Sequence, residues 1–301
     1  MLEILTRAGC FVAIIILGYI LKKIHFFKEE DFKILSKILL RITLPAAIVS
    51  SFVGKEIDAT MLALAIIGMG GGLLHIVIGY LCNRRAGREK QIFEIVNAGY
   101  NIGAFTMPFA QGFLGPIGVI TTSLFDIGNA FVCLGGSLGV ANILKDGGKF
   151  SVKKIGKALV RSIAFDCYLI MAIVSLFHLP IPTPVASFAE IVGNANAFVA
   201  MLMIGVGFKL SGDRKQIGRI VRILVARYVI ALVIAMGCFY LLPFALEVRQ
   251  ALMIVAFSPI PSSAPAYTEE LKSDVGMASA LNSISIVCSL VFIVSILLIA
   301  L

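Results

Sequence analysis

The chain has 301 residues, of which 59% are hydrophobic and 14% charged, and its mean hydropathy is +1.00. Soluble domains have about 45–50% apolar and about 25% charged residues, so this composition excludes an ordinary soluble globular protein. The net charge of +9 does not indicate a nucleic-acid partner, because the basic residues lie in short segments between apolar blocks. Each block has about 20 residues, the length that crosses the hydrocarbon core of a lipid bilayer. We therefore predict an all-α polytopic membrane protein.

About ten apolar blocks follow one another along the chain, and each predicts a transmembrane helix. The expected spans are 3–21, 34–53, 59–82, 91–113, 117–144, 157–178, 187–208, 219–243, 250–270 and 276–299. The connections are short, and no soluble domain or low-complexity linker interrupts them. The first block has its lysines after it and lacks a cleavage site, so we expect a retained helix rather than a signal peptide.

The basic residues are distributed very unevenly between the two sides of these spans. Of the 26 lysines and arginines, all but Arg7, Lys55 and Arg249 fall on one side. The positive-inside rule places that side in the cytoplasm and leaves both termini outside. Five spans on either side of a basic loop then predict two inverted five-helix repeats, residues 1–145 and 146–301.

The fourth and ninth expected spans are broken in their middles by residues that oppose a helix. The first break, residues 97–108, reads NAGYNIGAFTMP, and the second, residues 258–267, reads SPIPSSAPAY. In lipid every backbone polar group needs a partner, so such breaks are tolerated only inside protein or beside a wet cavity. Two breaks in corresponding places of the two halves indicate the binding site of a secondary transporter. We expect the two broken helices to cross near the middle of the membrane.

The breaks expose half-helix ends, which have a defined chemistry. N-terminal ends suit an anion such as a carboxylate, whereas the carbonyls of C-terminal ends suit a cation. The amide of Asn101 can bind a carboxylate or cap the half-helix, and the serines can contact substrate or satisfy freed carbonyls. The candidate substrate-binding residues are Asn97, Asn101, Gly103, Pro108, Ser258, Pro259, Pro261, Ser262, Ser263 and Pro265.

Polar residues inside the spans are candidates for ion coupling. They are Asp126, Asn129, Asp166 and His75. A proton carried by one of the titratable groups and a hydrogen-bonded structural role both remain open for each. The deeper arginines of the spans, Arg41, Arg161 and Arg227, are expected to snorkel to the cytoplasmic interface.

Motifs of other protein classes are missing from the sequence. The six cysteines are scattered singly without a CxxC pair, so neither a metal site nor a disulfide framework is indicated. No Walker A, HExxH or GxSG pattern occurs, so we expect no enzyme activity, no ATP hydrolysis and no cofactor. A channel stays an alternative, since broken helices also line pores.

The chain resembles the auxin efflux carrier family in its short prokaryotic form, over essentially its whole length. The resemblance rests on Leu44-Pro45, on the Asn-x-Gly-x-Asn-x-Gly-x-x-x-x-Pro pattern from Asn97 to Pro108, on Phe125-Asp126-Ile-Gly-Asn129, on Gly193-Asn194-Ala-Asn196, and on Val275-Gly-Met-Ala-Ser279 after the Pro-rich break. Together these motifs are fairly specific, whereas each one alone is weak.

The resemblance implies ten helices in two inverted repeats, similar to the bile-acid sodium symporters, with a scaffold of spans 1, 2, 6 and 7. It implies a homodimeric carrier of small organic anions such as auxin, malate or malonate that works by an elevator-like movement. Asn101 and Pro108 would line its substrate site. The coupling ion, H+ or Na+, stays open. Plant members have Asn in the second break where this chain has Pro and Ser, so the substrate stays open. The alternative is a sodium-coupled symporter of the bile-acid type. The short loops favour a bacterial inner membrane.

Overall fold

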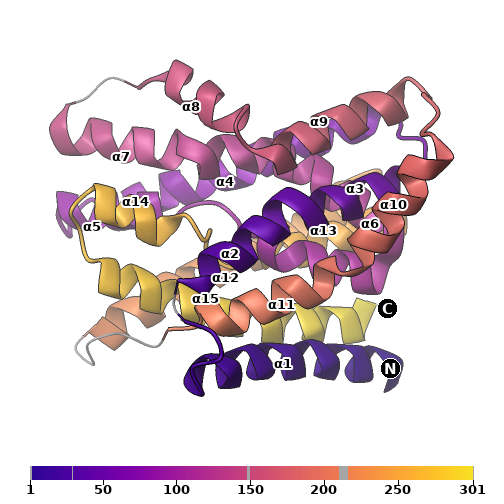
Figure 1. The fold of residues 1–301 in the computed structure, drawn as a ribbon. Helices are drawn as coiled ribbons and strands as arrows, with labels where there is room; N and C mark the ends of the chain where they lie inside the picture. The colour runs from indigo at the N-terminus through magenta and orange to yellow at the C-terminus, as the bar shows by residue number, and fades with distance from the viewer. Residues whose placement is uncertain (1, 29, 148–149, 210–215, 301) are drawn as a thin grey trace.

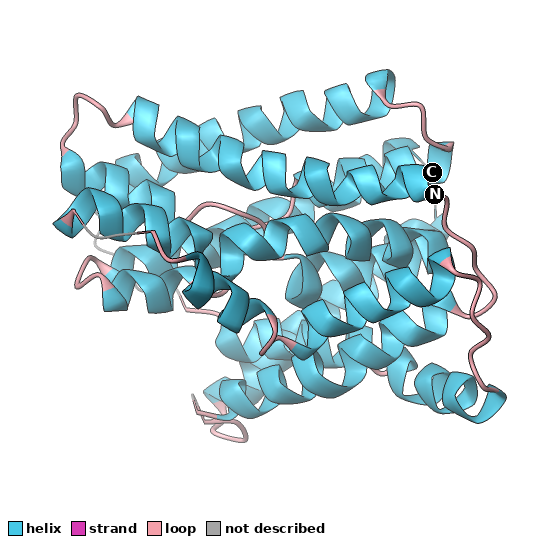
Figure 2. Ribbon diagram, turned by 90° about the horizontal axis from the view of Figure 1, so that it is seen from above, coloured by secondary structure: helices cyan, strands magenta, loops and turns pink. Residues whose placement is uncertain are grey.

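The helices lie roughly side by side, with both chain ends at the same end of the molecule (Figure 1, Figure 2). This computed structural model describes residues 2–28, 30–147, 150–209 and 216–300, and all regular structure in these ranges is helical. Three of the basic residues used for the orientation, Lys149, Arg214 and Lys215, lie outside the described residues.

The first half of the chain contains three π-helical turns, η1, η3 and η4, set between longer helices. Its elements are α1 (Leu2–Lys23), α2 (Asp31–Ile38), η1 (Leu39–Thr43), α3 (Leu44–Phe52), η2 (Ala59–Leu62), α4 (Ala63–Cys82), α5 (Arg88–Val96), η3 (Ile102–Thr106), α6 (Met107–Phe131), η4 (Val132–Gly136) and α7 (Ser137–Asp146). Gly115 has φ 60° and ψ −150°, so α6 consists of two helices that meet at Gly115 and Pro116. The kink falls where the fourth expected span ends and the fifth begins.

The second half begins with a sharply bent pair of helices. Its elements are α8 (Val152–Leu159), α9 (Ile163–Leu176), α10 (Thr183–Asn194), α11 (Asn196–Gly207), α12 (Ile217–Leu241), α13 (Leu246–Ala256), α14 (Ala264–Glu270) and α15 (Val275–Ala300). α8 and α9 are inclined by 78°, and Ser162 caps the new helix by accepting a hydrogen bond from the N–H of Phe165. Asp166 therefore lies in the first turn of α9, not deep within one straight span as its sequence position indicated.

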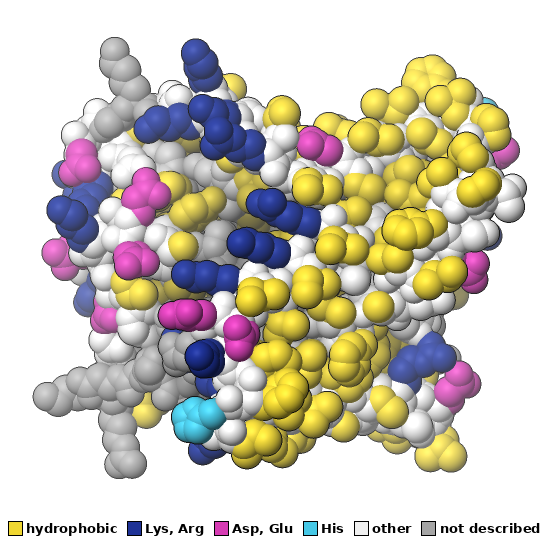
Figure 3. Space-filling model, in the orientation of Figure 1, with side chains coloured by type: hydrophobic (Ala, Val, Ile, Leu, Met, Phe, Trp, Pro, Cys, Tyr) yellow, Lys and Arg dark blue, Asp and Glu magenta, His cyan; other side chains and the backbone are white. Residues whose placement is uncertain are grey.

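Within the described ranges, six helical stretches are long and apolar enough to cross a membrane, or seven if α8 and α9 form one bent span. The six are Leu2–Lys23, Ala59–Cys82, Ile102–Asp146, Thr183–Gly207, Ile217–Leu241 and Val275–Ile299. Hydrophobic side chains cover the middle and right of the face in Figure 3, whereas most Lys and Arg gather toward its left end. The chain is therefore a polytopic helical membrane protein.

The helices α4 and α6 pack backbone against backbone. A Cβ atom on Gly128 would overlap the carbonyl of Ala65, and one on Gly68 would overlap the carbonyl of Phe125. Small residues at such contacts let helices approach closely in a membrane. The contact fixes the rotation of α6, so that Asp126 and Asn129 face the first break.

Candidate functional site

The two breaks touch each other inside the molecule. The first lies between the end of α5 at Val96 and the start of η3 at Ile102, and the second lies between α13 and α14. The backbone N–H of Asn101 donates to the carbonyl oxygen of Pro259 at 2.9 Å. The hydroxyl oxygens of Thr106 and Ser258 are 2.6 Å apart. Backbone and side chains of the two halves of the chain thus meet at one point, which we call the crossing.

Side chains of α15 satisfy the freed backbone of the second break. Asn282 donates through Nδ2 to the carbonyls of Ile260 and Pro261, at 2.9 and 3.2 Å. The N–H of Ile260 donates to Oγ of Ser285 at 3.1 Å. Partners of this kind are what irregular backbone requires at membrane depth.

The serines of the second break divide between the two roles that the sequence left open. Ser258 is fully buried and donates to the carbonyl of Val255 at 2.6 Å, and Ser263 donates to the carbonyl of Cys133 at 3.3 Å. Both satisfy backbone groups. Ser262 is exposed and lines both of the cavities beside the crossing.

Asn129 holds the first break in place from α6. Its Oδ1 accepts from the N–H of Tyr100 at 3.0 Å, and its Nδ2 donates to the carbonyl of Tyr100 at 2.9 Å. The same Nδ2 is 2.8 Å from Oδ1 of Asp126, whose Oδ2 accepts from the hydroxyl of Tyr168 at 3.0 Å. Asn129 therefore substitutes for a backbone partner, and both carboxylate oxygens of Asp126 have donors. The sequence offered no indication of the role of Tyr168.

The expectation that Arg227 snorkels to the interface is wrong. The residue is 6% exposed, and its Nη2 donates to the carbonyls of Gly99, Ser258 and Pro259 at 2.6, 3.1 and 3.1 Å. Arg227 lies ten residues into α12, which is about 15 Å along the axis, too deep for its side chain to reach the surface. That depth was readable from the sequence and is the signal that could have identified it.

Two cavities flank the crossing. The larger has a volume of about 500 Å³ and lies between α2, α11, α14 and α15. The smaller, of about 160 Å³, contains Asp126, Tyr168 and Gly103. Asn101 and Ser262 line both cavities, while Pro265 lines only the larger and Pro261 only the smaller.

Asn101 has its side-chain amide free for a ligand. It occupies the position before η3 but makes no capping hydrogen bond, so the capping role is not observed. In the part of the chain that the structure describes, its side chain has no hydrogen-bond partner, although it is only 8% exposed. The amide borders both cavities, so a carboxylate in either of them can accept a hydrogen bond from it.

The candidate residues His75, Asn97, Pro108 and Asp166 line neither of these two cavities. His75 packs edge-on against Tyr100, with ring centroids 5.0 Å apart, and lines a cavity of about 40 Å³ together with Asn97. Asn97 caps α5 by donating to the carbonyl of Phe93 at 2.6 Å. Pro108 is buried in the first turn of α6 and, like Asp166, lines none of the cavities described here. Among the described residues no three His, Cys, Asp or Glu side chains cluster as metal ligands would.

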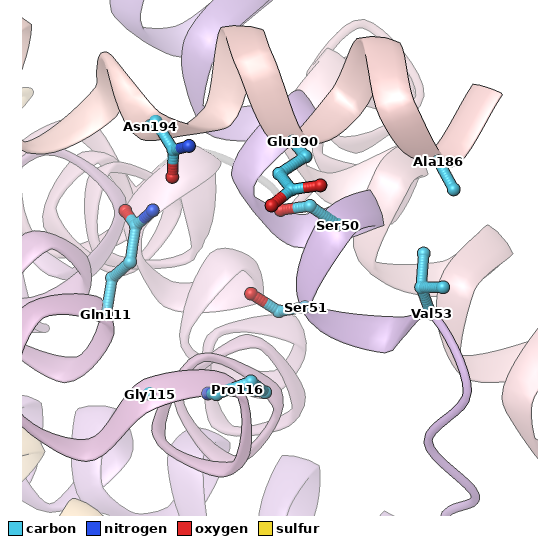
Figure 4. Close-up of a pocket in the computed structure, with 9 residues that line it drawn as sticks. All are labelled: Ser50, Ser51, Val53, Gln111, Gly115, Pro116, Ala186, Glu190 and Asn194. Atoms are coloured by element: carbon cyan, nitrogen blue, oxygen red, sulfur yellow. The ribbon is translucent and has the colours of Figure 1, made fainter. Parts of the chain in front are cut away.

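A cavity of about 400 Å³ lies at the opposite end of the molecule, between α3, α6 and α10 (Figure 4). Figure 4 shows the side-chain amides of Gln111 and Asn194 pointing toward each other, and Glu190 beside Ser50. Residues of the two breaks do not contribute to its lining.

A polar chain of side chains lies between this cavity and the crossing. Gln111 donates to the carbonyl of Gly193 at 3.1 Å and accepts from Nδ2 of Asn196 at 3.2 Å. Thr43 donates to Oδ1 of Asn196 at 3.2 Å. These bonds join α6 to η1, α10 and α11.

Comparisons with known proteins agree on one kind of activity. A family model described as "Membrane transport protein" matches residues 10–163, about half of the chain, including the first break and Asp126. A similar curated protein is an uncharacterized transporter of Methanothermobacter thermautotrophicus, which is 26% identical over 288 residues and matched over 93% of each chain. Both findings indicate transport rather than catalysis.

Proposed function

Because the chain belongs to the membrane transport protein family, that of the auxin efflux carriers, we propose that it is a secondary active transporter of small organic anions. The observation that carries this proposal is the crossing, where the unpartnered side-chain amide of Asn101 borders a cavity of about 500 Å³. Broken helices that meet beside such a cavity are the usual substrate sites of secondary transporters.

The larger cavity has the chemistry that a small carboxylate needs. Asn101 supplies an amide and Ser262 a hydroxyl. Both residues also line the smaller cavity, where the helix that begins at Ile102 places its positive dipole end. The opposite wall, with Met203 and Ile204, is apolar and would contact the hydrocarbon part. Malate, malonate and auxin-like carboxylates are the substrates that we propose.

We propose ten membrane spans, counting α2–α3 and each of the two broken helices as one span, in two inverted repeats. The basic residues gather at the end opposite the chain termini, which supports termini on the outer side (Figure 1, Figure 3). A scaffold would comprise α1 to α3 and α8 to α11, and the remaining helices would form the transport domain.

Alternating access by an elevator-type movement is part of the same proposal. The larger cavity involves the scaffold helices α2 and α11, whereas the cavity at the other end involves α3 and α10. Both therefore lie along one boundary between scaffold and transport domain, at opposite ends. The hydrogen bonds of Gln111 and Asn196 cross this boundary and would break when the outer side opens.

The proposed coupling ion is a proton carried by Asp126. Its carboxylate lines the smaller cavity, which shares Asn101 and Ser262 with the larger one. An ionisable residue within a membrane and beside a substrate cavity is a candidate proton carrier.

The test uses the purified protein in proteoliposomes on a solid-supported membrane. Concentration jumps of malate, malonate, lactate and indole-3-acetate are applied with and without a pH gradient and sodium. We expect a saturable current for one of these acids, enhanced by the pH gradient. Electroneutral exchange is detected by counterflow of the labelled acid. If folded protein gives neither a current nor counterflow with any of the four acids, the proposal is wrong.

A further inference from the structure

The crossing contains a buried positive charge whose partners are backbone carbonyls. Arg227 comes from α12, outside both breaks, and a guanidinium remains ionised in proteins. Among the described residues, no carboxylate lies within ion-pair distance of it. A buried charge is costly unless it is compensated, so the carbonyls around it must provide that compensation.

Three carbonyl oxygens from the two breaks converge on one nitrogen of this side chain. Nη2 is 2.6 Å from the oxygen of Gly99, and 3.1 Å from each of the oxygens of Ser258 and Pro259. Gly99 follows the end of α5, and the other two follow the end of α13. Both half-helices thus direct their negative dipole ends toward the guanidinium.

The surroundings complete an environment for a cation. The ring of Tyr100 faces the guanidinium, with Cζ of Arg227 5.7 Å from the ring centroid. Unwound carbonyls at half-helix C-terminal ends are the groups that bind Na+ in sodium-coupled transporters with broken helices. In this chain such carbonyls bind the guanidinium of Arg227, a cation that belongs to the protein itself.

We propose that Arg227 is a built-in substitute for a coupling sodium ion, so that the carrier holds its crossing together without sodium. This inference rests on the proposed function for its meaning in transport. It excludes the sodium-coupled alternative at this position, because the three oxygens that would bind Na+ are occupied by Nη2. It also assigns Arg227 as a positioning residue, which acts on the substrate site through the backbone of both breaks.

The test removes the side chain and offers free cations in its place. Arg227→Ala leaves three carbonyls facing a void, and Arg222→Ala is the control on the same helix. Arg222 is 58% exposed in its side chain and contacts Asn83 and Glu94 instead. The melting temperature of each purified variant is measured in sodium chloride, in choline chloride at equal ionic strength, and in choline with low millimolar guanidinium.

We expect the wild-type melting temperature to be the same in sodium and in choline. Arg227→Ala should melt lower, and sodium or guanidinium should raise its melting temperature by roughly 2–5 °C over choline. Arg222→Ala should show no difference between these salts. If Arg227 only packed against its neighbours and the three carbonyls could not bind a free cation, sodium and guanidinium would not raise the melting temperature of Arg227→Ala selectively.

Two results would overturn the inference. One is a wild-type protein that sodium stabilises over choline or whose transport requires sodium. The other is an Arg227→Ala variant that folds but responds to none of the cations. If Arg227→Ala does not fold, Arg227→Lys, which retains a charge at the site, is measured in its place. If that variant does not fold either, the comparison of wild-type melting in sodium and in choline decides. The melting data need no substrate, so they remain decisive even if the transport proposal fails.

Discussion

Replacing Asn129 by alanine tests how the first break is held. Four hydrogen bonds disappear: two with the backbone of Tyr100, one to Asp126 and one from the thiol of Cys133. The N–H and C=O of Tyr100 then lose this partner in a buried place, since Asn129 is 1% and Tyr100 2% exposed. Alanine is smaller and cannot supply either group, so the break has no replacement for these bonds.

The magnitude follows from the groups left unsatisfied. Each buried backbone group without a partner costs about 1–3 kcal/mol, and interhelical hydrogen bonds in membranes are worth as little as about 0.6 kcal/mol each. Asn129→Ala should therefore destabilise the protein by about 2–6 kcal/mol. At about 2–4 °C per kcal/mol, the melting temperature should fall by roughly 4–24 °C.

The assay is thermal unfolding in detergent, with Asn101→Ala as the matched control. Because the chain has no tryptophan, unfolding is monitored by light scattering and by a thiol-reactive dye. Asn101 loses no side-chain hydrogen bond to the described part of the chain, so its variant should melt within about 2 °C of wild type. If Asn129→Ala also melts within 2 °C of wild type, the hydrogen bonds do not hold the break and the reasoning is refuted.

Two further predictions concern α6. Gly128→Ala should destabilise by about 1–3 kcal/mol, because the new methyl group overlaps the carbonyl of Ala65, whereas Gly70→Ala meets nothing within 4 Å and should melt like wild type; equal melting of the two variants would contradict the α4–α6 packing. Asp126→Asn should lose the stimulation of uptake by a pH gradient but keep counterflow, since the proton carrier is removed while the substrate cavity remains. A retained pH response in this variant would exclude Asp126 as the proton carrier.

The sequence was sufficient to predict the two breaks, because proline and glycine clusters within apolar blocks have few interpretations in lipid. It also marked Asp126 and Asn129, whose polar side chains are conspicuous within an apolar span. It could not tell Ser258 from Ser262, because a serine that satisfies a carbonyl and a serine that faces a cavity look alike in sequence. The two serines differ in tertiary placement, since Ser258 is buried against Thr106 and Ser262 lines the two cavities.

The structure differs from the sequence-based expectations where the chain bends or where distant segments meet. The bend between α8 and α9 moved Asp166 to a helix start, and a continuous apolar pattern does not record such a bend. The depth of Arg227 was readable from the sequence, but its carbonyl partners were not, because they lie 128, 31 and 32 positions away in the chain. The hydrogen bond from Tyr168 to Asp126 could not be predicted either, because the two residues lie 42 positions apart.

The most direct test of the central claim compares two asparagine variants in counterflow of the transported acid. Asn101→Ala removes the free amide at the crossing, and Asn194→Ala removes an amide from the cavity at the other end. A hydrogen bond to a charged group is worth about 1.5–3 kcal/mol, so Asn101→Ala should weaken substrate affinity by about 10–100-fold. Asn194→Ala should leave affinity within about twofold. Wild-type affinity in folded Asn101→Ala would contradict a substrate site at the crossing.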